Sequence, residues 1–253
     1  GDNDLVHSIA TAYTLPTNVE HLIIDGKSKG NGTGNVLDNK LIGNLAVNVL
    51  SGLAGNDTLD GGNGIDTVDY SDSTVMKIDL VNGKATDGKF TDSLINIENI
   101  IGSSQADILV GDNNNNLLVG GLGDDVVYGN GGNDTIITGG GNDQIFGGSG
   151  DDVFKFGIDT ITRDVPSRDV ISDFSFVNGN KDVIDLSEID ANPYQAGDQA
   201  FSFITDSKFT APGQLMFDAS THTLNGYVGG NATKDFSIVL TGVNYIDMKF
   251  LIL

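Results

Sequence analysis

The sequence predicts an all-β fold: a parallel β-roll in two blocks, with an inserted hairpin and a C-terminal β cap. Three observations lead to it: Asp or Asn recurs every nine residues, an apolar residue follows each of them two positions later, and glycine is abundant. Glycine accounts for 35 of the 253 residues and proline for only 4. Short repeats of this kind are typical of solenoids, in which each unit buries its apolar side chain only by stacking on its neighbours.

Ten rows keep the nine-residue register, and they form two arrays. The register residues are Asn39, Asn48, Asp57 and Asp66 in the first array, and Asp107, Asn116, Asp125, Asp134, Asp143 and Asp152 in the second. The apolar residues two positions later are Leu41, Leu50, Leu59, Val68, Leu109, Leu118, Val127, Ile136, Ile145 and Phe154. The arrays are out of register with each other, which indicates an insertion between them.

Each row combines a turn with a short strand. The run Gly129-Asn130-Gly131-Gly132-Asn133-Asp134 favours a turn, because glycine tolerates positive φ and Asn and Asp tolerate it best among the others. The residues that follow, Thr135-Ile136-Ile137, favour a strand. Two rows then complete one coil of 18 residues, and successive coils stack about 4.8 Å apart. The apolar residues of the rows form a dry internal ladder.

The stacked turns require a cation. Stacking places Asp125 against Asp143 and Asp134 against Asp152, and carboxylates that close raise each other's pKa unless a cation lies between them. Ten acidic residues and no Lys or Arg lie between Phe90 and Phe154, so the cation has to come from solution. Calcium, with six to eight oxygen ligands, suits such turns better than magnesium, which demands tighter octahedral geometry.

The predicted ligands are the register side chains and the carbonyl groups of the second and fourth residues of the rows, enough for about four to six calcium ions. Asp125 with Asp143 and Asp134 with Asp152 are the strongest pairs. Asp107 with Asp125, Asp57 with Asn39, and Asp66 with Asn48 follow. Asn39, Asn48 and Asn116 offer only a neutral amide, so their sites are expected to be weaker. The predicted carbonyl ligands belong to Gly62, Gly64, Gly121, Gly123, Gly132, Gly139, Gly141, Gly148 and Gly150.

Five segments are expected. Residues 1–33 form an irregular β lead-in, whose first coil caps or extends the roll. Residues 34–69 form the first block of the roll, 70–101 an insertion, 102–155 the second block, and 156–253 the C-terminal cap. In the insertion, Asn82-Gly83 predicts the turn of a hairpin that bulges from the roll. In the cap, Asp173, Asp182 and Asp185 are candidates for a further ion, although turn capping explains them equally well.

The rows 61–69, 120–128 and 147–155 resemble the glycine- and aspartate-rich nonapeptide of RTX proteins, which bind calcium in a parallel β-roll. Residues 102–253 resemble the C-terminal domain of serralysin-type secreted metalloproteases in the order of their motifs. These resemblances imply a bacterial, extracellular protein exported by a type I secretion machinery, with an uncleaved signal in the last residues.

Composition and motifs exclude several functions. The chain contains 13 Lys and Arg and 35 Asp and Glu, which gives a net charge of -22. Nucleic acid and anionic membranes are therefore poor partners. Cysteine is absent, which excludes disulfides and thiolate sites. No apolar run reaches the roughly 20 residues of a membrane span. Neither a His-Glu-x-x-His nor a Gly-x-Ser-x-Gly motif occurs, so no catalytic site is expected in this chain, whatever the activity of its parent protein.

The expected function is therefore calcium-dependent folding outside the cell, in support of the export and stability of a larger exoprotein. The lack of an initiator Met and of a secretory signal peptide at Gly1 favours a segment of a longer polypeptide. The alternative is a carbohydrate-binding or adhesive module that calcium makes rigid, attached to a secreted polysaccharide-modifying enzyme or adhesin and contacting extracellular polysaccharide.

Overall fold

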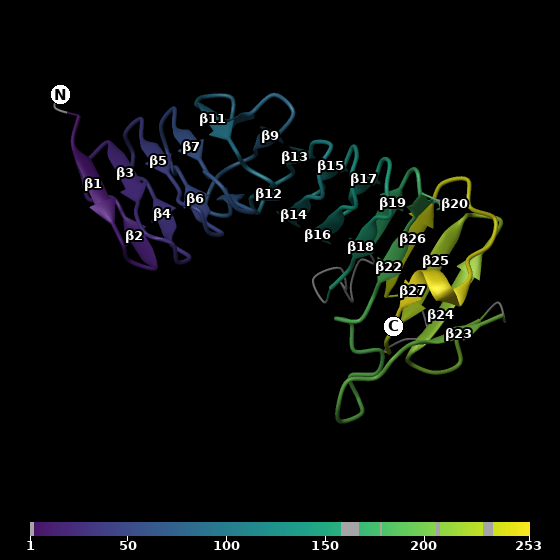
Figure 1. The fold of residues 1–253 in the computed structure, drawn as a ribbon. Coiled ribbons are helices and arrows are strands. Elements are labelled where there is room, and N and C mark those ends of the chain that lie inside the picture. The colour runs from purple at the N-terminus through teal and green to yellow at the C-terminus, as the bar shows by residue number, and fades with distance from the viewer. Residues whose placement is uncertain (1–2, 158–166, 178, 206–207, 230–234) are drawn as a thin grey trace.

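The computed structural model of the chain describes residues 3–157, 167–177, 179–205, 208–229 and 235–253. Two long β-sheets run side by side along an elongated, bent molecule (Figure 1). The chain passes from one sheet to the other at most turns, except between residues 77 and 95 and between residues 202 and 240. The first sheet contains, in spatial order, β1 (Leu5–Ser8), β3 (His21–Ile24), β5 (Lys40–Ile42), β7 (Thr58–Asp60), β11 (Thr91–Ile95), β10 (Lys84–Thr86), β9 (Lys77–Asp79), β13 (Ile108–Val110), β15 (Val126–Tyr128), β17 (Gln144–Phe146), β19 (Ser167–Ile171), β26 (Phe236–Leu240), β25 (Thr223–Tyr227), β24 (Gln214–Asp218) and β23 (Ser202–Ile204).

The second sheet is shorter. It contains, in order, β2 (Ala12–Thr14), β4 (Asn31–Thr33), β6 (Val49–Ser51), β8 (Thr67–Asp69), β12 (Asn99–Ile101), β14 (Leu117–Leu122), β16 (Thr135–Gly140), β18 (Val153–Lys155), β22 (Val183–Asp185) and β27 (Leu251–Ile252). A separate hairpin joins β20 (Phe176–Val177) to β21 (Asn180–Lys181), and a 3-10 turn, η2 (Met248–Phe250), precedes β27.

The predicted parallel β-roll is confirmed by the strand register. Lys40 pairs with Thr58, Ile108 with Val126, and Thr135 with Val153, each in a parallel ladder. Each partner lies 18 residues further along the chain, so two nine-residue rows make one coil. The register residue of each row therefore stands directly beside that of the next coil.

The apolar ladder is the core of the roll. All ten predicted ladder residues, from Leu41 to Phe154, are at most 1% exposed. They alternate between the two sheets and point inward, because strand side chains alternate between faces. The neighbours on each side point outward: Ile108 is 39% exposed, whereas Leu109 beside it is completely buried.

The roll begins earlier than residue 34. The segment expected to be an irregular lead-in contains β1 to β4, which pair in parallel and extend both sheets. Its coil lengths depart from 18 residues, since Leu5 pairs with His21 and Ala12 with Asn31. The sequence period therefore misses these coils, although Leu22 and Ile24 occupy the same buried ladder.

The predicted hairpin lies within the first sheet instead of bulging from it. β9 and β10 are antiparallel, β10 pairs in turn with β11, and β11 pairs in parallel with β7. Three strands thus separate β7 from β13 in the first sheet, whereas only β12 separates β8 from β14 in the second. Two extra strands lengthen one sheet by about 10 Å, and the roll bends at this point (Figure 1).

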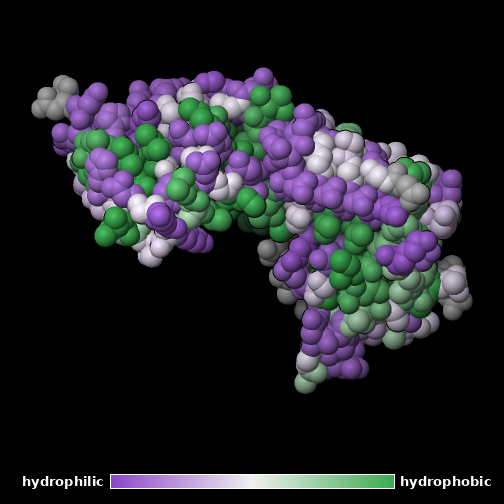
Figure 2. Space-filling view, viewed as in Figure 1, coloured by the Kyte–Doolittle hydropathy of each residue, from purple (hydrophilic) through white to green (hydrophobic). Residues whose placement is uncertain are grey.

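The C-terminal part continues the same two sheets. β19 carries the parallel ladder on to β26, and β25 and β24 follow in antiparallel order. The other sheet ends where Ile184 of β22 pairs with Leu251 of β27. Figure 2 shows hydrophilic side chains along the second block of the roll and hydrophobic ones over part of the C-terminal strands.

Leu109→Ala should destabilise the roll by about 2–5 kcal/mol, because it leaves a cavity in the apolar ladder. Ile108→Ala, on the same strand but facing outward, should cost about 0.5 kcal/mol or less. Urea unfolding in saturating calcium measures both. Similar losses for the two variants would contradict the ladder.

Candidate metal centre

The register residues lie in two rows of turns, one at each edge of the roll. Turn row 1 leads from the first sheet to the second and contains Asn48, Asp66, Asn116, Asp134 and Asp152. Turn row 2 leads back and contains Asn39, Asp57, Asp107, Asp125 and Asp143.

One carboxylate oxygen of each register Asp supports the preceding coil. The backbone N–H of Asp125 donates to Oδ1 of Asp143 at 2.8 Å, and that of Asp134 donates to Oδ1 of Asp152 at 2.9 Å. The same bond joins Asp107 to Asp125 and Asn116 to Asp134, both at 2.8 Å. These bonds hold each carboxylate at the interface between two successive turns.

The second carboxylate oxygen has no partner in six of the rows. Oδ2 is buried and without a hydrogen bond in Asp57, Asp66, Asp125, Asp134, Asp143 and Asp152. All six side chains belong to residues at most 1% exposed. A buried carboxylate oxygen left without a hydrogen bond or a cation is costly. Each of the six oxygen atoms therefore requires a partner. A hard metal ion, which binds oxygen ligands, is such a partner.

Burial raises the pKa of these carboxyl groups. It raises the pKa of Asp125 to about 8, with the charge of Asp143 acting in the same direction, and that of Asp134 to about 7, with the charge of Asp152 adding to it. The pKa of Asp57 rises to about 7 and that of Asp66 to about 6, again mainly through burial. Without a cation, the folded roll strongly disfavours the ionised carboxylates.

Among the described residues, no basic side chain supplies the missing charge. The ion pairs among the described residues are His7 with Asp25, Lys155 with Glu188, and Lys249 with Asp247. None of them includes a register carboxylate. Within the same part of the chain, no three acidic or histidine side chains gather as a metal cluster, so backbone carbonyl groups would have to complete each site.

The carbonyl groups needed for this purpose face the neighbouring turns. A Cβ on Gly141 would collide with the carbonyl oxygen of Gly123, and one on Gly150 with that of Gly132. A Cβ on Gly139 would likewise meet the carbonyl oxygen of Gly121. All the predicted carbonyl ligands come from glycines with positive φ: Gly62, Gly64, Gly121, Gly123, Gly132, Gly139, Gly141, Gly148 and Gly150.

In five of the six rows with a free Oδ2, the first residue is a glycine that lies beside this oxygen, a position outside the predicted ligand set. A Cβ on Gly120 would collide with both Oδ2 of Asp125 and the carbonyl oxygen of Thr138 in the next coil. A Cβ on Gly129 would do the same with Oδ2 of Asp134 and the carbonyl oxygen of Gly147. Free carboxylate and carbonyl oxygens thus converge beside glycine, and this donor set fits calcium.

Four predicted ligands differ from the other six. These four are buried, but in each of them a side-chain oxygen already accepts a backbone N–H from its own turn. The bonds run from Asn35 to Asn39 Oδ1, from Asn44 to Asn48 Oδ1, from Asp112 to Asn116 Oδ1, and from Ser103 to Asp107 Oδ2. The amide nitrogen of Asn116 also donates to the carbonyl of Glu98 at 2.7 Å. These four side chains lack the free oxygen of the other rows.

The carboxylate ladder includes residues outside the nine-residue period. Asp92 accepts the N–H of Asp57, Glu98 that of Asp66, Asp169 that of Asp143, and Asp182 that of Asp152. Each precedes a buried apolar residue by two positions: Leu94, Ile100, Ile171 and Ile184. The apolar spacing could have revealed all four, but only if the requirement for a fixed period had been dropped.

The three candidates in the C-terminal cap act as hydrogen-bond acceptors. Asp173 accepts the N–H groups of Gly147 and Gly148, and Asp185 caps the turn at Ser187. Asp182 accepts N–H groups at both oxygens, from Asp152 at 3.2 Å and Ser175 at 2.7 Å.

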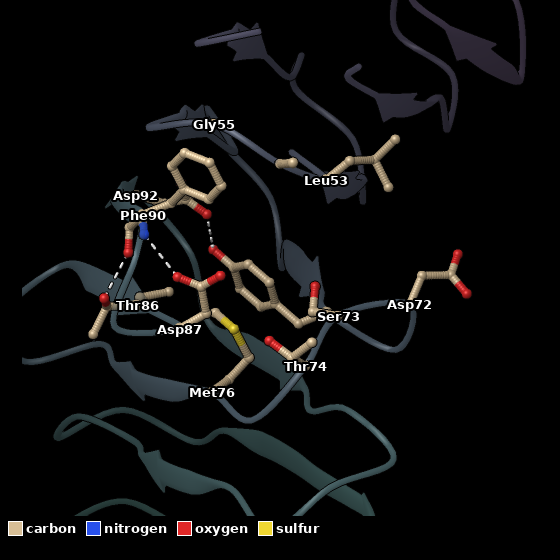
Figure 3. A pocket seen from close by; sticks show the side chains of 13 residues that line it. Leu53, Gly55, Asp72, Ser73, Thr74, Met76, Thr86, Asp87, Phe90 and Asp92 are labelled. Carbon is tan, nitrogen blue, oxygen red and sulfur yellow. Dashed lines mark hydrogen bonds between the residues drawn. The ribbon is translucent and has the colours of Figure 1, made fainter. Parts of the chain in front are cut away.

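A pocket of about 260 Å³ opens in turn row 2, where the insertion widens the first sheet (Figure 3). Tyr70 donates its hydroxyl to Oδ2 of Asp92 at 2.8 Å on one side. The Phe90 ring lies at its edge under the Lys89 ammonium group, 4.2 Å from the ring centre. Asp87 accepts the N–H of Phe90 at 2.7 Å.

The comparison with protein families agrees with this geometry. The family model of the RTX calcium-binding nonapeptide repeat matches residues 33–68, 96–127 and 128–160. The chain therefore contains RTX nonapeptide repeats, which bind calcium, folded as a parallel β-roll. Repeats of this kind are typical of secreted bacterial proteins. No helix among the described residues is long and apolar enough to cross a membrane.

Two solved structures are similar to the chain at low identity. The solution structure of the AlgE6R3 subunit of a mannuronan C5-epimerase from Azotobacter vinelandii shares 21% identity, with a TM-score of 0.42, over 59% of this chain and 79% of that one. The extracellular lipase LipA from Serratia marcescens shares 17% identity, with a TM-score of 0.19, over 90% of this chain and 40% of the lipase. No curated protein sequence matches the chain.

Without calcium, the roll should be more stable at pH 5 than at pH 8. The folded-state pKa of Asp125, about 8, and that of Asp134, about 7, both lie above the ordinary value of 3.8. At intermediate pH, the folded chain thus holds protons that the unfolded chain has released. The contribution of these two carboxyl groups to the free energy of unfolding is complete below about pH 4, and it is lost as the pH rises through 7 to 8.

Urea unfolding in EDTA between pH 5 and pH 8 measures this dependence. In saturating calcium it should reverse, because protons then compete with the metal for the same carboxylates. Stability in EDTA that increases with pH would contradict the assignment of these groups.

Proposed function

We propose that this chain is a calcium-driven folding module of a larger exoprotein, which stays open inside the cell and folds after export. The observation that carries the proposal is the set of six buried Oδ2 atoms without partners, on Asp57, Asp66, Asp125, Asp134, Asp143 and Asp152. Folding without the ion buries these groups at a cost. Binding the ion removes that cost, so binding free energy becomes folding free energy.

The difference in calcium between the two sides of the membrane would set the direction of folding. At low cytosolic calcium, carboxylate repulsion and the conformational entropy of 35 glycines favour an open chain that a type I secretion machinery can thread. Extracellular calcium modules bind at about 10⁻⁴–10⁻³ M, a range that separates the two states. The shared interfaces of the turns, such as the one between Asp125 and Asp143, would make the transition cooperative.

A calcium titration followed by far-UV circular dichroism tests this function. The β-sheet signal should rise cooperatively between about 10⁻⁴ and 10⁻³ M calcium, and magnesium should not reproduce it. A spectrum that is already fully folded in EDTA would contradict calcium-driven folding.

Asp134→Asn should lower the number of bound calcium ions by at least one and make the folding transition less steep. The variant replaces one oxygen of a buried pair with an NH₂ group, which cannot ligate a cation. Asp72→Asn, at an exposed position, removes the same charge and serves as the control. Isothermal titration calorimetry gives both stoichiometries, and equal ion counts in the two variants would remove Asp134 from the ligand set.

A second candidate function, carbohydrate binding, rests on the pocket in the insertion. Phe90 and Met76 give it an apolar side, and Ser73 and Thr74 bring hydroxyl groups (Figure 3). Three carboxylates, those of Asp72, Asp87 and Asp92, also line it, so a neutral sugar suits it better than a uronate. A glycan array probed with the wild type and with Phe90→Ala, with and without EDTA, tests this candidate.

A further inference from the structure

The fourth residue divides the ten register rows into two kinds of turn. Six rows have glycine there, and both the second and the fourth residues have positive φ, as in Gly121 (109°) and Gly123 (110°) before Asp125. In the other four rows neither position has positive φ. The fourth residues of those four rows are Leu37, Ala46, Gln105 and Asn114.

The four rows without this glycine close on themselves. In the turn before Asp107, the N–H of Ser103 donates to Asp107 Oδ2 at 2.5 Å, and Ser103 Oγ accepts the N–H of Gln105 at 3.1 Å. In the turn before Asn116, Asp112 makes the equivalent pair of bonds, at 2.8 Å each. Asn35 and Asn44 repeat the arrangement before Asn39 and Asn48. Side chains of this type commonly close turns in this way.

In the six rows with the glycine, no second residue donates its N–H to the register Asp of its own row where its acceptor is known. Gly148 donates to Asp173 at 2.9 Å, not to Asp152, and Gly62 donates to Asp60 at 3.2 Å, not to Asp66. These six rows are the ones in which Oδ2 of the register Asp is buried without a partner.

The glycine at the fourth position, not the second residue, is the common feature of the six. Leu53 (φ 68°) and Asn130 (φ 74°) occupy the second position with positive φ, and each is followed two residues later by a glycine, Gly55 or Gly132. A non-glycine residue rarely adopts this conformation unaided. A turn with a non-glycine fourth residue does not adopt the positive-φ conformation. The N–H of its second residue then donates to the register side chain.

We propose that the fourth residue of a row decides whether its turn binds calcium, so that six turns are calcium turns and four are closed turns that need no ion. The proposal rests on the calcium-binding function above and restricts its ligand set. Asp107 is then a turn-closing residue, although its sequence position is that of a calcium ligand.

The closed turns occupy one coil at the start of each block. Asn39 and Asn48 precede the calcium turns of Asp57 and Asp66, whereas Asp107 and Asn116 precede those of the second block. A coil with complete hydrogen bonds can form without metal, and it presents backbone N–H groups to the first register carboxylates of the next coil. The bonds from Asp107 to Asp125 and from Asn116 to Asp134 are these contacts. Each block thus carries its own metal-independent template.

Two matched variants of the full chain test the division. Asp107→Asn should bind as many calcium ions as the wild type, whereas Asp125→Asn, one coil further in the same turn row, should bind at least one fewer. Ion counts come from isothermal titration calorimetry and from equilibrium dialysis with radioactive calcium. A loss in Asp107→Asn equal to that in Asp125→Asn would overturn the proposal.

A conversion of the closed turn 111–116 tests the cause. Asn116→Asp alone should add no ion, because Asp112 and Asn114 keep the turn out of the positive-φ conformation that the six calcium turns share. Asn116→Asp combined with Asp112→Gly and Asn114→Gly should bind at least one more ion than the wild type. A gain in the single variant, or none in a folded triple variant, would overturn the role of the fourth residue.

These outcomes differ from a failure of the proposed function. If the wild type binds no calcium, calcium-driven folding itself is wrong. If the wild type binds calcium but Asp107→Asn loses an ion, only the division of the turns is wrong. A triple variant that does not fold leaves the comparison of Asp107→Asn with Asp125→Asn to decide.

Discussion

The fold of this chain depends on how each register carboxylate divides its two oxygens. One oxygen accepts a backbone N–H from the coil before, as Asp143 does from Asp125, and this bond fixes the stacking of the turns. The other oxygen is then held at the same interface, buried and without a hydrogen-bond partner in six rows. Stacking and metal demand are therefore consequences of the same geometry. A roll with these turns has to recruit a cation or keep protons on its carboxylates.

The rest of the structure accommodates this constraint. Glycine is needed in the turns because carbonyl groups of one coil approach the Cα atoms of the next too closely for a Cβ, as Gly123 approaches Gly141. The ladder from Leu41 to Phe154 supplies a narrow core that cannot offset many buried charges by itself. At the ends of the carboxylate ladders, Asp169 and Asp182 provide the last acceptors. The C-terminal strands then complete both sheets, which end at β23 and β27.

The two extra strands of the insertion bend the roll without interrupting the ladders. Asp92 and Glu98 take over the acceptor role across it, for Asp57 and Asp66 respectively. The insertion thus separates two groups of calcium turns while keeping them on one continuous pair of sheets. It also creates the pocket around Tyr70 and Phe90 in turn row 2.

The sequence by itself determined the coil, the core and the type of metal site. A strict period of nine residues, with an apolar residue two positions after each Asp or Asn, leaves one way to stack short parallel strands, and an acidic turn without basic neighbours requires a hard cation. Only the tertiary structure revealed which register side chains keep a free oxygen. Asp107 and Asp125 look alike in the register, but a backbone N–H reaches the second oxygen of Asp107 and not that of Asp125. The structure also shows Asp92, Glu98 and Asp169 in the carboxylate ladders. Two strands can pair whatever the length of the segment that connects them, so a fixed period in the sequence does not reveal these residues.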